Sequence, residues 1–181
     1  MLRAFTIKLV PYSCVIRPTR SFSASSIRNG LKVGLEGTAI GLTQSLKVLG
    51  DDHVNHVIKT DCFESLGGAD LHPDPIQLLY SSISGCQNIT ANLVAKDNGI
   101  KVGKAKITIE ADHDIVDKTP GKYPGFLTSS VIVNYELETD ANDEQFERLR
   151  EETEAKCPIA NVFINSSGLK FTSNWINVPL R

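Results

Sequence analysis

Two cysteines occupy positions at which a thiol could do chemistry. Cys157 directly precedes Pro158, and proline disfavours helical geometry in the residue before it but suits the first position of a helix. The sequence therefore predicts a short helix over residues 158–165, with Cys157 at its start. Free amides and the helix dipole stabilise an anion there, which lowers the pKa of a thiol and raises its reactivity. The alternative role is that of a small residue filling a tight corner between two helices.

Cys86 lies in the middle of the longest helix that the sequence predicts, residues 75–98. Asp74 can cap this helix ahead of a proline, and Gly99 can end it. A thiol on an apolar helix face commonly behaves as a small apolar residue. Gly85 is unfavourable inside a helix, by roughly 1 kcal/mol relative to alanine, and indicates that a packed element, another subunit or a ligand approaches closely. Steps of three and four residues predict one apolar face made of Leu79, Ile83, Cys86, Ile89 and Leu93.

The rest of the chain predicts an α+β fold, because strand-like and helix-like patterns both occur along it. A second helix is expected from about residue 142 to residue 156, with acidic residues in its first turn. Turns are expected at Gly37 and at residues 50–52, and an exposed connection is expected at residues 112–128. The expected strands cover residues 31–36, 38–48, 53–59, 101–111, 130–139 and 169–178.

The first thirty residues differ in composition from the rest. They hold five basic residues and many serines, and no acidic residue precedes Glu36. This composition is typical of a mitochondrial transit peptide, and the run RSFS at residues 20–23 resembles a matrix-processing site. We therefore expect residues 1–30 to be a transit peptide, with a disordered basic arm as the alternative. Residues 31–181 are expected to form one domain, located in the mitochondrial matrix.

Charge and hydropathy exclude several classes of function. The chain has 181 residues and a formal net charge of −2. Cleavage near Phe22 would remove four positive charges and no negative ones, which leaves −6. Such an acidic protein is a poor candidate for binding nucleic acid or an anionic membrane surface. No apolar run approaches the ~20 residues that a membrane span needs.

Three cysteines would remain after cleavage, and they do not form a structural disulfide framework in a reducing compartment. No two of them have C-x-x-C spacing, and the four histidines do not cluster with them. Neither a metal site nor a bound cofactor is predicted. Cys62 lies in a polar loop and is interpreted as incidental.

Two blocks of the sequence resemble the OsmC/Ohr family, the organic hydroperoxide reductases and their relatives. In residues 67–86 a glycine pair is followed by a helix that starts with proline and carries Cys86 three turns in. In residues 146–159 a helix ends in Cys157 and Pro158. Order and spacing agree from about residue 31 to the end of the chain. We expect a eukaryotic mitochondrial member of this family.

The resemblance implies both a fold and a chemistry. The implied fold is OsmC-like, with antiparallel sheets wrapped around long central helices in an intertwined homodimer. The implied catalytic residues are Cys86, which attacks a peroxide and becomes a sulfenic acid, and Cys157, which condenses with it to a disulfide. A dithiol, such as that of a lipoylated protein, then reopens the disulfide. The expected function is a thiol-dependent peroxidase that reduces organic or lipid hydroperoxides.

One departure from the family pattern favours an alternative function. In the active reductases a glutamate after the helix-starting proline pairs with an arginine from the first strands and holds the thiolate. Ile76 and Gln77 stand in that region here, and residues 31–59 contain no arginine, so Arg28 is the nearest one. The alternative is an OsmC-like dimer with little or no peroxidase activity that binds an apolar ligand or partner or senses oxidation. A third possibility is a structural accessory protein with both thiols buried.

Overall fold

The computed structural model describes residues 34–49 and 56–180. The expected transit peptide, Arg28 and the expected turn at residues 50–52 lie outside these ranges. The described elements confirm a mixed α+β fold with two sheets and three helices. Among these residues, no helix is long and apolar enough to cross a membrane.

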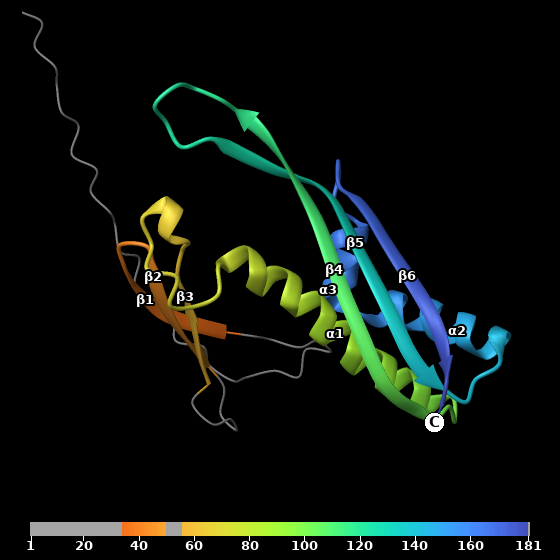
Figure 1. The fold of residues 1–181 in the computed structure, drawn as a ribbon. Helices are drawn as coiled ribbons and strands as arrows, with labels where there is room; N and C mark the ends of the chain where they lie inside the picture. Colours follow the sequence, from red (N-terminus) through yellow and green to blue (C-terminus); the bar gives the residue numbers. More distant parts are fainter. Residues whose placement is uncertain (1–33, 50–55, 181) are drawn as a thin grey trace, which may run out of the picture. The chain divides into compact units, whose positions relative to one another are not determined.

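The first sheet is an antiparallel meander of three short strands (Figure 1). They are β1 (Gly34–Ile40), β2 (Thr43–Leu49) and β3 (Val57–Thr60). The turn predicted at Gly37 is wrong, because Gly37 lies inside β1 opposite Leu46. A Cβ atom at Gly37 would lie 2.4 Å from the Ser45 carbonyl oxygen, so close strand approach explains the glycine. The turn is formed instead by Gly41, whose φ of +60° is readily adopted by glycine.

The long helix α1 (Pro75–Asp97) agrees with its predicted position. Asp74 accepts a hydrogen bond from the Ile76 amide at 2.7 Å, and Gln77 accepts one from the Asp74 amide at 3.0 Å. These two bonds form a capping box that satisfies free amides of the first turn. Gly99, with a φ of +68°, follows the last turn as expected.

The second sheet has the order β4 (Val102–Asp117), β5 (Gly125–Thr139) and β6 (Lys170–Pro179) (Figure 1). β4 and β5 form an antiparallel hairpin that extends through much of the connection expected at residues 112–128. β6 pairs parallel to β5, so the expectation of purely antiparallel sheets is corrected here. A parallel neighbour needs a crossover connection, and two helices between β5 and β6 provide it.

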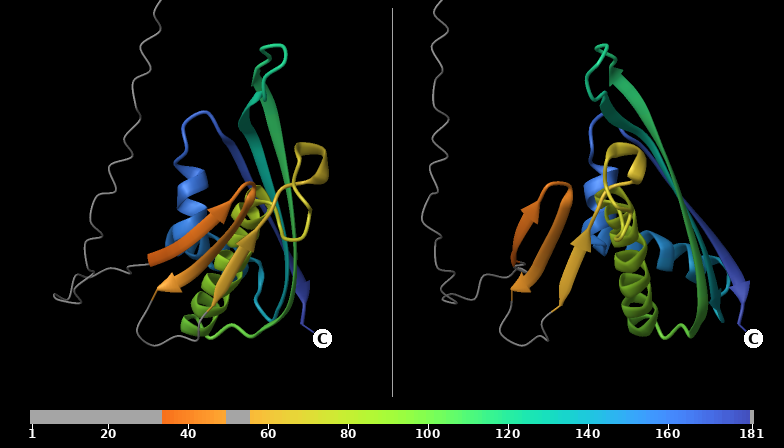
Figure 2. Two further views of the ribbon diagram at one scale, coloured as in Figure 1. Left: turned by 90° about the vertical axis from the view of Figure 1, so that its left-hand side faces the viewer. Right: turned by 60° about the vertical axis from the view of Figure 1, so that its left-hand side comes forward.

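These two helices are α2 (Asp143–Lys156) and α3 (Pro158–Ile164), and with α1 they cover one face of the second sheet (Figure 2). The core between helices and sheet consists of two apolar clusters. The first cluster joins α1 and α2 to the sheet and contains Ala91, Val94, Ala95, Ile100, Tyr135, Leu137, Phe146 and Leu149. The second cluster joins α1 and α3 to the sheet and contains Ile83, Val131, Val133 and Phe163.

The buried face of α1 differs from the apolar face that the sequence predicts. Leu79, Ile89 and Leu93 are 47%, 63% and 58% exposed, and we call these three residues the exposed stripe of α1. Small side chains explain the difference, because alanines at the contact let α1 pack closely on its neighbours. The buried residues of α1 are Ile83, Gln87, Ala91, Val94 and Ala95.

A buried carboxylate organises the segment between β3 and α1. Asp61 accepts hydrogen bonds from the backbone amides of Cys62 at 2.8 Å, Leu71 at 3.1 Å and Ala69 at 3.3 Å. The Thr43 hydroxyl donates a longer one from β2 at 3.4 Å. The bond from Cys62 is the largest of the causes that lower the pKa of Asp61. Asp61 therefore ties the loop that precedes α1 to the first sheet.

Replacing this carboxylate should destabilise the fold in a pH-dependent way. Asp61→Asn is expected to lower Tm at neutral pH, because an amide accepts fewer of these hydrogen bonds and carries no charge. A lowered native pKa gives stability that is present above the ordinary carboxyl pKa and is lost as pH falls through the lowered value. Thermal unfolding should therefore show the difference shrinking in acid. Asp117→Asn, which replaces an exposed carboxylate bonded only to nearby Thr119, is the control, and equal Tm values for both variants at neutral pH would contradict the role of Asp61.

Candidate active site

The fold brings Cys86 and Cys157 together, although they are 71 positions apart in the sequence. Burial raises the pKa of Cys157, and the nearby Cys86 thiol raises it further. Both cysteines are free thiols. Cys86 is half-buried, and Cys157 is fully buried. The pair therefore consists of one partly exposed thiol and one fully buried thiol.

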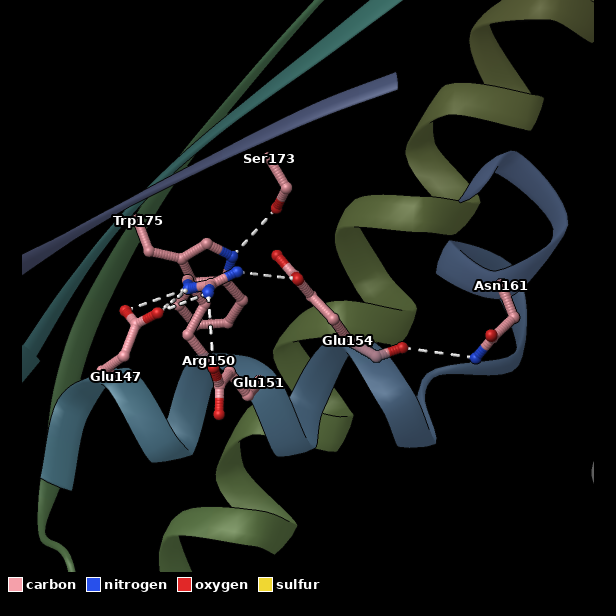
Figure 3. A network of polar contacts seen from close by, with 7 residues as sticks. All are labelled: Glu147, Arg150, Glu151, Glu154, Asn161, Ser173 and Trp175. Atoms are coloured by element: carbon pink, nitrogen blue, oxygen red, sulfur yellow. Dashed lines mark hydrogen bonds and ion pairs between the residues drawn. The ribbon is translucent and has the colours of Figure 1, made fainter. Parts of the chain in front are cut away.

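A break between two helices positions Cys157. The Cys157 amide donates the last bond of α2 to the Thr153 carbonyl at 2.9 Å, and α3 begins at the next residue. The Asn161 side chain donates to the Glu154 carbonyl at 3.2 Å (Figure 3). It also donates to the carbonyls of Ala155 at 3.0 Å and Cys157 at 3.0 Å. Asn161 thus satisfies carbonyls that the end of α2 leaves without helical partners. The predicted break at Cys157 is confirmed.

The electrostatic prediction for Cys157 is wrong. The Ala160 amide donates to Sγ of Cys157 at 3.4 Å, as expected for a helix start. Burial nevertheless raises the pKa of Cys157 above its ordinary value, and Cys86 raises it further, against the lowering effect of the Ala160 and Ile159 amides. The loss of hydration raises the pKa of the Cys157 thiol by more than the amides at the helix start lower it, because the side chain is fully buried. Cys157 is therefore not the more reactive thiol of the pair by electrostatics.

The surface beside Cys86 is open. A Cβ atom added to Gly85 would meet nothing within 4 Å, so no part of the described chain explains the glycine. An open groove of about 470 Å³ runs between α1 and β4 at this point. It is lined by Ser84, Gly85, Asn88, Asn92, Gly103, Ala105 and Ile107.

A second hollow, of about 330 Å³, lies between α1, α3 and β5, and neither cysteine lines it. Its walls are mostly apolar and include Leu79 and Phe163. On one side the Tyr80 hydroxyl lies 3.2 Å from Nε2 of His113, and the Thr128 hydroxyl lies 3.1 Å from Nδ1 of the same ring. The sequence analysis did not single out these residues, since they come from separate elements. An apolar hollow with a few polar groups is typical of small-molecule sites.

No activating pair replaces the glutamate and arginine of the active reductases within residues 34–49 and 56–180. The Gln77 side chain is engaged in the capping box of α1, and Ile76 is 46% exposed. The arginines of these ranges, Arg148 and Arg150, both lie on α2. Arg150 contacts Glu147 and donates to Glu154 at 2.9 Å, in the network that Figure 3 shows. Arg150 is therefore already neutralised by its own helix.

Comparison with known proteins agrees with this arrangement. The family described as OsmC-like protein matches residues 67–172, which is more than half of the chain and includes both cysteines. The chain belongs to the OsmC-like family. No curated protein matches the sequence.

Solved structures support the same fold. An OsmC-like protein from Mycoplasma pneumoniae is 20% identical, with 82% of this chain and 98% of that chain covered and a TM-score of 0.64. An organic hydroperoxide resistance protein from Elizabethkingia anophelis is 22% identical, with 84% and 100% covered and a TM-score of 0.62. An organic hydroperoxide resistance protein from Legionella pneumophila is 18% identical, with 81% and 97% covered and a TM-score of 0.56. At these identities the similarity establishes the OsmC-like fold and not the activity.

Thiol alkylation should separate the two cysteines. Cys86 is expected to react with iodoacetamide faster than Cys157, because the raised pKa of Cys157 lowers its thiolate fraction and the thiolate is the form that reacts. Burial of Cys157 slows the reaction further. Timed labelling followed by peptide mass spectrometry measures both rates, with half-buried Cys62 as an internal reference. Faster labelling of Cys157 than of Cys62 would contradict the closed site.

Proposed function

We propose that this protein is a thiol-dependent peroxidase that reduces organic hydroperoxides through Cys86 and Cys157. The contact between a half-buried thiol and a fully buried one carries the proposal. A second thiol within reach of the first can condense with its sulfenic acid to a disulfide. Membership of the OsmC-like family, with structural neighbours named as hydroperoxide resistance proteins, supports this reading.

The reaction proceeds in three steps. The Cys86 thiolate attacks a peroxide oxygen, the O–O bond breaks, and the alcohol leaves with an added proton, so that Cys86 becomes a sulfenic acid. The Cys157 sulfur then attacks the Cys86 sulfur and forms the S–S bond. The S–O bond breaks, and hydroxide leaves as water with the proton that Cys157 releases. A dithiol restores both thiols through two exchange reactions and is itself oxidised to a disulfide.

The surroundings of the pair favour an organic substrate. The apolar hollow is lined by residues of α1, which contains Cys86, and of α3, which begins after Cys157, and it has room for a hydrocarbon group. Hydrogen peroxide would gain nothing from such a surface. We therefore assign organic or lipid hydroperoxides as the substrate class.

A homodimer is part of the proposal. Every residue of β1 except Gly34 is exposed, with Ile40 at 87%, and a small sheet with so little buried surface does not stabilise itself in water. The exposed stripe of α1 adds a second apolar surface. A second copy of the chain that covers both surfaces also supplies the neighbour that Gly85 indicates.

Residues 1–30 are proposed to direct import into the mitochondrial matrix. The basic, serine-rich and acid-free composition of these residues motivates this assignment. A lipoylated protein of the matrix is the proposed source of the reducing dithiol. A fusion of residues 1–30 to a reporter protein tests this proposal and is expected to be imported into mitochondria. A reporter that stays outside mitochondria would contradict the proposed import function.

The use of Gln77 in the helix cap favours a second candidate function. Ile76 follows the helix-starting proline, where the active reductases have a glutamate, so no carboxylate of residues 76–77 holds an arginine beside the Cys86 thiolate. The second candidate is a dimer that forms the Cys86–Cys157 disulfide slowly, as a sensor of oxidation or a binder of an apolar ligand, with little turnover.

Peroxide turnover distinguishes the two candidates. Stopped-flow measurement should show consumption of cumene hydroperoxide with dihydrolipoamide as reductant. Cys86→Ser is expected to abolish it, and Cys157→Ser to stop after one equivalent with a trapped sulfenic acid, because each variant lacks one of the two sulfurs. Turnover that persists in Cys86→Ser rules out the proposed peroxidase. Disulfide formation without turnover supports the sensor instead.

The dimer interface is open to a direct test. Leu93→Glu places a charge on the exposed stripe of α1 and is expected to raise the dimer dissociation constant roughly thirtyfold or more, as for the loss of a central apolar contact. Light scattering during size-exclusion chromatography measures the change. Lys96→Glu, at the polar end of the same helix, is the control. A wild-type protein that is monomeric at all concentrations would refute the dimer.

A further inference from the structure

The core contains polar side-chain atoms that have no hydrogen-bond partner. Gln87 and Thr153 are fully buried, and Nε2 and Oε1 of Gln87 and Oγ1 of Thr153 are unpartnered among the residues that the structure describes. Oε1 of Glu154 is also unpartnered, but its other carboxylate oxygen accepts from Arg150. A buried amide without partners is strongly unfavourable, so Gln87 needs a physical explanation.

Gln87 occupies the boundary between the two apolar clusters. On α1, Ile83 belongs to the second cluster and Ala91 to the first, and Gln87 lies one turn from each on the same face. It directly follows Cys86 in the sequence. The amide therefore enters the core at the level of the thiol pair rather than at either apolar cluster.

The opposing helices show the same change from apolar to polar residues. Leu149 of α2 belongs to the first cluster and Phe163 of α3 to the second. Between them come Thr153 and, one turn later, Cys157, both fully buried. We call Gln87, Thr153 and Cys157 the polar layer, since each lies between the clusters on its own element. The structure thus concentrates its unpartnered buried groups where the two thiols meet.

We propose that Gln87 is a positioning residue for disulfide formation: its amide N–H, unpartnered in the dithiol state, donates to the Cys157 sulfur when that thiol loses its proton, with the Thr153 hydroxyl as a second donor. The inference rests on the proposed redox function of the pair and adds a residue to it. A thiolate accepts hydrogen bonds from an amide N–H and from a hydroxyl, and these bonds are stronger than those to a neutral thiol. A thiolate in a closed site needs such donors while its proton passes to the departing hydroxide.

A purely structural role predicts a different outcome. Replacing an unpartnered buried amide by an apolar side chain of similar size then removes an unfavourable group, so stability rises and chemistry is unchanged. A trapped water bonded to Gln87 predicts altered stability with unchanged chemistry. Neither alternative alters the rate or the pH dependence of disulfide formation.

Gln87→Met in the full-length protein tests the inference. After one equivalent of cumene hydroperoxide, disulfide formation is expected to slow roughly ten- to hundredfold, as for a lost hydrogen bond to a charged group, and its pH profile to move to higher pH. Trapping of the Cys86 sulfenic acid with dimedone should proceed at the wild-type rate. Unchanged disulfide formation in Gln87→Met overturns the inference. A wild-type protein that forms no disulfide refutes the proposed function instead.

Two threonine variants provide an independent reading if Gln87→Met does not fold. Thr153→Val removes the other unpartnered group of the polar layer and is expected to slow disulfide formation in the same way. Thr139→Val is the matched control, because the Thr139 hydroxyl is also buried but donates to Asn177 at 2.7 Å, away from the thiols. It should lower Tm without changing the redox rates. Equal redox rates in all threonine variants and wild type overturn the inference.

Discussion

The contact between Cys86 and Cys157 is the constraint on which the arrangement of the elements depends. One thiol comes from the middle of a capped 23-residue helix, and the other comes from a break that Asn161 holds between α2 and α3. Cys157 lies between the two helices that connect β5 to β6, and this crossover also allows β6 to run parallel to its neighbour. Sheet topology and redox pair are thus consequences of the same crossover.

Local signals made much of this fold predictable. Single residues with known backbone preferences determine the caps of α1 and the break at Cys157-Pro158. The structure has both at the expected positions. Joining the two cysteines required the family resemblance. No spacing rule relates residues 71 positions apart, because only tertiary packing brings them together.

The errors have physical causes that a single sequence does not display. A glycine at position 37 is typical of a turn, but here it allows two neighbouring strands to approach closely. The large apolar residues of α1 predict one face of the helix as buried. The structure instead buries a face that contains alanines, and Leu93 is exposed. The pKa of Cys157 depends on burial, which outweighs the helix start. In the sequence Gln87 is only a polar residue one turn from two apolar ones, and its burial without hydrogen-bond partners is visible only in three dimensions.

The covalent state of the protein after one equivalent of an organic hydroperoxide tests the central claim most directly. Intact-mass analysis should show the loss of two hydrogen atoms per chain, and non-reducing peptide maps should show Cys86 joined to Cys157 of the same chain. Cys62 should remain a free thiol. A protein in which Cys86 accumulates as a sulfinic acid while Cys157 stays reduced, or in which neither thiol changes, would contradict the account.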